Sequence, residues 1–135
     1  MKTNITLGIL GIALVGFMVW VYTLPKVSVS ELIASDGIHW HPHLAIVEKG
    51  KSVSIPANIG IGAVHNPVHT HDDTGTIHLE FGGRVRKEDI MLVRFFEVWG
   101  KKFEGVPVVK INNATSTDGM NLLMHDGDKI EVDFK

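Results

Sequence analysis

Seven of the eight histidines of this 135-residue chain fall between His39 and His78. The spacings are His39-x-His41-x-His43, His69-x-His71 and His78-x-Glu80. Because side chains two positions apart on a strand point to the same face, these spacings predict strands that present their imidazoles together. Neutral imidazole is a good ligand for zinc, copper, iron and nickel. The histidine pattern therefore predicts a metal site built on β-strands.

The composition excludes several other kinds of site. The chain contains no cysteine, so it has no disulfide scaffold, thiolate zinc finger, iron–sulfur cluster or cysteine nucleophile. With 13 Lys and Arg against 15 Asp and Glu, the formal charge of −2 offers no basic footprint, and we expect no nucleic-acid partner. The ligand chemistry is thereby narrowed to imidazole and carboxylate.

The N-terminal region is the most apolar part of the chain. Residues 5–24 contain no charged side chain and would span about 30 Å as a helix, the thickness of a bilayer core. We therefore predict a single-pass membrane anchor over residues 1–25, with a cleaved signal sequence as the alternative. Lys2 favours a cytoplasmic N-terminus. This arrangement predicts a location at the cell membrane, with the C-terminal domain outside the cytoplasm.

The rest of the chain reads as a short connector and one domain. Residues 26–38 form the connector, with a short helix at residues 31–34, and residues 39–135 form the metal-binding domain. The predicted strands of this domain cover residues 39–48, 52–55, 68–71, 76–81, 106–111 and 129–134. Residues 72–75 form a hairpin turn in which Gly75 takes a left-handed conformation.

A single helix is expected over residues 88–99, ended by Gly100. The predicted fold class is thus mostly β with one helix, a small antiparallel β-sandwich or barrel-like domain preceded by one N-terminal transmembrane helix.

The predicted metal ligands are the alternating histidines and one carboxylate. They are His39, His41, His43, His69, His71, His78 and Glu80. Glu80 has two other interpretations, as an acceptor that orients a ligating imidazole or as a solvated strand residue. His65 and His125 are expected to be ordinary histidines.

Near these ligands, Asp72 and Asp73 are expected to form a turn, with Asp72 also a candidate partner of His71. Met120 and Met124 are expected to fill the core, rather than to ligate Cu(I).

Four strings of the sequence resemble an uncharacterised family of exported or membrane-anchored, histidine-rich proteins of archaea and actinobacteria. They are HWHPHLAIV, IPANIGIG, HTHDDTGTIHLE and FFEVWG, which recur in that family in this order. The resemblance spans residues 39–134, and the predicted hairpin of residues 68–81 is its most specific part. It implies that the seven predicted ligands form one functional block, and it implies no particular activity. The chain departs from many relatives in lacking cysteines after its Trp-Gly.

These observations predict a membrane-anchored, extracytoplasmic protein that binds copper or zinc for ion capture, buffering or delivery. One alternative is a metalloenzyme in which three histidines hold a metal and its water, with Glu80 as general base. A cupin-like oxygenase fits poorly, because Glu80 lies nine residues after His71 instead of three or four. The sequence is also compatible with an accessory subunit of a membrane complex and with a cluster of pH-sensing histidines.

Overall fold

The computed structural model describes residues 2–24 and 31–135, with side chains for residues 11–24 and 31–135. The helical elements are α1 (Lys2–Thr23), η2 (Lys87–Ile90), α2 (Leu92–Trp99) and η3 (Gly119–Asn121). The strands of the first half are β1 (Leu32–Ala34), β2 (Ile38–Trp40), β3 (His43–Glu48), β4 (Lys51–Val53) and β5 (Val68–His69). Those of the second half are β6 (His78–Phe81), β7 (Val85–Arg86), β8 (Pro107–Ile111), β9 (Ala114–Thr115) and β10 (Lys129–Phe134).

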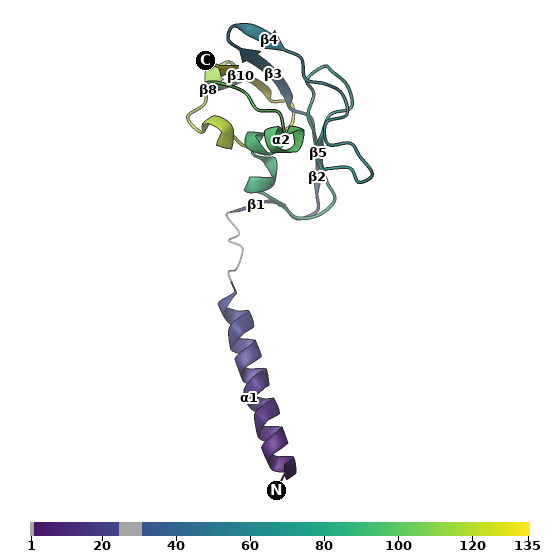
Figure 1. The fold of residues 1–135 in the computed structure, drawn as a ribbon, viewed down its shortest axis with the longest axis vertical. Coiled ribbons are helices and arrows are strands. Elements are labelled where there is room, and N and C mark those ends of the chain that lie inside the picture. Colours follow the sequence, from purple (N-terminus) through teal and green to yellow (C-terminus); the bar gives the residue numbers. More distant parts are fainter. Residues whose placement is uncertain (1, 25–30) are drawn as a thin grey trace.

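The strands form three sheets, drawn in Figure 1, with the orders β4-β3-β10-β8-β9, β2-β6-β5 and β1-β7. The pair of β3 and β10 is parallel, whereas the other pairs are antiparallel. The predicted fold class, an antiparallel sandwich or barrel with one helix, is therefore wrong. The described chain has mixed sheets and two α-helices. Periodicity failed here because β10 inserts between β3 and β8 through contacts far apart in the sequence.

The core lies between the sheets and α2. Alternation buries Leu44 and Ile46 of β3, and it likewise buries the apolar residues of β10. Helix α2 packs against β5 and contributes the fully buried Phe95 to this core. It ends as predicted at Gly100, which takes a left-handed conformation with φ of 69°. Its first turn, predicted as α-helix, is the separate 3₁₀ helix η2.

The predicted strand over residues 39–48 is two strands in two different sheets. The break falls at His41 and Pro42, where proline has no N–H to continue a ladder. The carbonyl of Pro42 accepts a hydrogen bond of 2.9 Å from Ile77, and the N–H of Leu44 donates one of 2.8 Å to Gly75. These bonds attach the hairpin turn of residues 72–75 to the break. The histidine-bearing segments are thus joined at this point.

The connector also differs from its prediction. Residues 32–34 form β1, which pairs with β7, instead of the expected short helix. An apolar Leu-Ile-Ala run can form either a helix or a strand. Here it forms a strand, because it pairs with Val85 and Arg86. Residues 25–30, the rest of the connector, lie outside the described residues.

Helix α1 lies away from the sheets in Figure 1. Within residues 2–24 and 31–135, no helix has the combined length and apolar character needed to cross a membrane. This finding contradicts the predicted transmembrane helix and the cell-membrane location that was inferred from it.

The turn at Gly75 provides a test of how the hairpin is held. Gly75 has φ of 86°, and a Cβ there would lie 2.4 Å from the carbonyl oxygen of Leu44. We expect Gly75→Ala to lower the free energy of unfolding by more than about 1–2 kcal/mol, because a left-handed L-residue alone costs that much. The matched control is Gly82→Ala, where a Cβ meets nothing within 4 Å. Chemical denaturation measures both variants, and equal stability of the two would contradict this account of the turn.

Candidate metal centre

The register of the three-stranded sheet gathers the histidines. Strand β6 is the middle strand and carries His78 and Glu80 on one face. His69 of β5 is directly opposite His78, and His39 of β2 is directly opposite Glu80. Continued one step beyond the end of β2, the same register brings His41 opposite His78. His78 therefore lies between His41 and His69.

The distances between ring centroids follow this register. The His78 ring lies 4.8 Å from that of His41, 5.3 Å from that of His69 and 4.5 Å from that of His71. The rings of His39 and His41 are 4.7 Å apart, as are those of His69 and His71. We call this set the histidine face. It comprises His39, His41, His69, His71, His78 and Glu80.

A first group of donors suited to one metal ion consists of His69, His71, His78 and Glu80. One ligand atom from each lies within 4.8 Å of the others. His69 is only 2% exposed, whereas His71 and Glu80 reach the solvent. This group therefore has a buried side and an open side.

His69 is held in one tautomer by its backbone surroundings. Its Nδ1–H donates a hydrogen bond of 2.9 Å to the carbonyl of Asn66, since a carbonyl only accepts. Nε2 of His69 is then the nitrogen with the lone pair, and it lies 3.2 Å from Nε2 of His71. Metal-ligating histidines typically have their second nitrogen fixed in this way.

His78 offers a nitrogen that has no hydrogen bond. Within the described residues, its Nδ1 is the buried side-chain polar atom left without a hydrogen-bond partner. The Oε1 atom of Glu80 lies 3.6 Å away, beyond hydrogen-bonding distance. Leaving such a group unpaired costs about 1–3 kcal/mol. A metal ion would satisfy this nitrogen, so the donor set fits a cation.

A second group consists of His39, His41 and His78, whose ligand atoms also lie within 4.8 Å of one another. Asp126 fixes the position of His41. Its Oδ1 accepts a hydrogen bond of 2.7 Å from the backbone N–H of His41 and lies 3.6 Å from the Nδ1 of that ring. His39 and His41 are both exposed, so this group faces the solvent.

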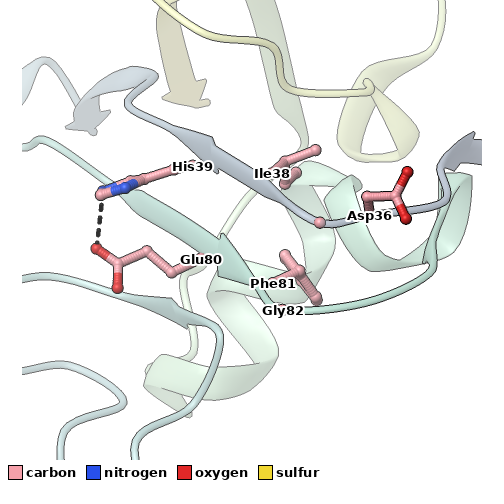
Figure 2. A pocket seen from close by; sticks show the side chains of 7 residues that line it. Asp36, Ile38, His39, Glu80, Phe81 and Gly82 are labelled. Atoms are coloured by element: carbon pink, nitrogen blue, oxygen red, sulfur yellow. Dashed lines mark ion pairs between the residues drawn. The ribbon is translucent and has the colours of Figure 1, made fainter.

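Glu80 connects the two groups. Its Oε1 lies 3.0 Å from Nε2 of His39 and 3.6 Å from Nδ1 of His78. Figure 2 shows the side chains of His39 and Glu80 pointing toward each other across β2 and β6. They border an open pocket of about 520 Å³ that extends along Ile38 and Phe81. Ions therefore have access to this side of the histidine face.

Three histidines lie outside both groups. His43, a predicted ligand, is exposed, and its Nε2–H donates a hydrogen bond of 2.8 Å to the carbonyl of Thr74. His65 and His125 are exposed as well. The ring of His65 lies 6.3 Å from that of His69, and the ring of His125 lies 5.4 Å from that of Trp40. The structure thus brings six of the seven predicted ligands together and separates His43 from them.

Other residues near the histidine face have structural roles. Asp72 forms the predicted turn by accepting hydrogen bonds from the N–H and hydroxyl of Thr74, at 3.0 and 2.6 Å. These bonds hold the pKa of Asp72 below its ordinary value, with smaller contributions from His78 and His71. Met124 is buried in the core and Met120 packs against it, as predicted.

Sequence reasoning missed two partners of the histidine face. One is Asp126, which lies between η3 and β10, and the other is the backbone carbonyl of Asn66. Asp126 is 85 positions away from His41, and no spacing rule connects them. The Pro67 that follows Asn66 signals a turn before β5, which is the one local hint of that carbonyl's position.

The surroundings keep the two central imidazoles neutral. Burial lowers the pKa of His69 below 6.5, against the opposing effect of the hydrogen bond to Asn66. Burial also lowers the pKa of His78, together with the neighbouring rings of His71, His41 and His69. Neutral imidazole is the form that binds a metal. Each of the two rings therefore stays neutral, and able to ligate, at a lower pH than an ordinary histidine.

Comparisons of the chain with protein-family models, with curated proteins and with solved structures give no match. The family resemblance drawn from the four sequence strings therefore stays a prediction.

The lowered pKa values predict how the metal-free protein responds to acid. Because folding holds the pKa of His69 and His78 below 6.5, the unfolded chain binds more protons once the pH falls below that value. The free energy of unfolding should thus decrease as the pH falls from neutral through about 6.5. In His69→Gln and His78→Gln this decrease should be smaller. Denaturation in a chelating buffer measures it, and a wild-type protein that becomes more stable in acid would contradict the assignment.

Proposed function

We propose that this protein binds a copper or zinc ion through the first group of the histidine face. The ligands are His69, His71, His78 and Glu80. The observation that carries the proposal is the meeting of three imidazoles and a carboxylate within 4.8 Å, together with the buried Nδ1 of His78, which has no hydrogen-bond partner. This set contains no sulfur, which suits Zn(II) or Cu(II) better than Cu(I).

The arrangement favours an ion that is exchanged over one that is permanently enclosed. His69 anchors the site from the buried side, and its orientation is fixed by Asn66. His71 and Glu80 are exposed, so the ion can be reached from the solvent. A binding site with one rigid and one open side is suited to ion capture, buffering or delivery.

A metalloenzyme remains a second candidate because Glu80 is exposed and lies beside an open pocket. In that case the three histidines would hold the ion and Glu80 would act on its bound water. The number of protein ligands distinguishes the two functions. Four protein ligands favour binding, and three with an open water position favour catalysis.

Single substitutions test the ligand set. We expect His71→Ala and His78→Ala each to weaken Zn(II) and Cu(II) binding by about 10-fold or more, since even changes to residues behind a ligand have effects of this size. His43→Ala is the matched control, because His43 is an exposed histidine of the same cluster in sequence but belongs to neither group. Calorimetric titration of the chelator-treated protein measures the affinities, with circular dichroism as a check of folding.

The same titrations can also contradict the proposed ligand set. If His43→Ala lost as much affinity as His71→Ala, or if folded wild-type protein bound neither ion, the proposed site would be wrong.

A further inference from the structure

Two pairs of histidines lie on opposite sides of His78, and they are too far apart to share one ion. One pair is His39 and His41, and the other is His69 and His71. Within the described residues, no donor group contains a member of both pairs. With metal–nitrogen bonds of about 2 Å, two ligand atoms on one ion lie at most about 4 Å apart, so even the atoms of one group, which lie within 4.8 Å, move slightly closer to share an ion. One ion therefore uses one pair and leaves the other without an ion.

His78 is positioned to serve both pairs. It belongs to both donor groups, and an imidazole ring that releases its N–H proton to the solvent offers a nitrogen to an ion on each side. Its ring lies 4.8 Å from that of His41 on one side and 4.5 Å from that of His71 on the other. The shared residue is thus in contact with both halves of the histidine face.

Glu80 occupies a similar intermediate position. It is a member of the first group, yet its Oε1 lies only 3.0 Å from Nε2 of His39 in the second. A carboxylate has two oxygens and can hold two ions at once, as it does in two-metal sites of proteins. Glu80 therefore connects the groups through a negatively charged side chain.

The surrounding charge also suits more than one cation. Besides Glu80, each half of the histidine face has a carboxylate of its own. Asp126 lies beside His41, with 3.6 Å between its Oδ1 and the Nδ1 of the ring. Asp72 directly follows His71 and is coupled electrostatically to His71 and His78. These carboxylates offset the repulsion between two closely spaced cations.

From this geometry we infer that the histidine face holds two metal ions side by side. One ion binds to the pair His69 and His71, the other binds to the pair His39 and His41, and His78 and Glu80 lie between the ions. The inference rests on the proposed function, because the first ion occupies the site proposed above. It adds a second, more exposed site and makes the centre dinuclear.

The number of ions per chain tests this inference. The full chain is stripped with chelator and titrated with Cu(II) and, separately, with Zn(II), and native mass spectrometry counts the bound ions. We expect two ions in the wild type and one in the double variant His39→Ala/His41→Ala, whose changes are at exposed positions. The double variant His43→Ala/His125→Ala is the matched control and should keep two. In the Cu(II) form, dipolar broadening of the electron paramagnetic resonance spectrum should be present in the wild type and absent from His39→Ala/His41→Ala.

Three other outcomes would overturn either the two-ion inference or the proposed function. A wild type that binds a single ion overturns the two-ion inference and leaves the proposed function standing. Two ions in His39→Ala/His41→Ala overturn it as well, because the second ion then lies elsewhere. A folded wild type that binds no ion overturns the proposed function itself.

Discussion

The pairing of β6 between β2 and β5 is the interaction on which the histidine face depends. This register places His69 opposite His78 and His39 opposite Glu80, while the other face of β6 buries Leu79 in the core. A shift by one residue would turn every side chain of β6 to the opposite face. The fully buried Leu79 therefore helps to fix the register that brings the imidazoles together. Hydrophobic packing and ligand placement are thus set by the same strand.

Parts of this arrangement could be predicted from the sequence because they are local. The one-residue spacing of His69 and His71 and that of His78 and Glu80 correctly indicated that each pair comes close together. The predicted tight turn is longer than expected, because β5 ends at residue 69 and β6 begins at residue 78. The turn residues Asp72 and Gly75 were recognised for the same reason, since their roles depend on neighbours within a few positions. The burial of Ile130, Val132 and Phe134 in the last strand also followed from simple alternation.

Other parts could not be predicted because they depend on contacts between distant segments. The parallel pairing of β3 with β10 has no periodic signature, and it changed the fold class from antiparallel to mixed. The break at Pro42 sends His43 into another sheet from His39, although the spacing of the two is regular. The hydrogen bond between Asp126 and His41 likewise joins residues that no spacing rule connects. The pairing of β2 with β6, which brings His39 and His41 to the other histidines, is therefore known only from the structure.

The histidine face combines a rigid inner part with an accessible outer part. His69 is buried and fixed by Asn66, whereas His39 and His41 lie at the surface beside carboxylates. Burial keeps the central rings neutral, which is a requirement for ligation, and it leaves Nδ1 of His78 without a hydrogen bond. One physical explanation accounts for these features, namely a cation that binds Nδ1 of His78 in place of a hydrogen-bond partner.

X-ray absorption spectroscopy of the zinc-loaded protein tests that explanation most directly. The account predicts a first shell containing nitrogen at about 2.0 Å, with the outer-shell scattering of several imidazole rings. A zinc spectrum with an oxygen-only first shell and no imidazole scattering would contradict it.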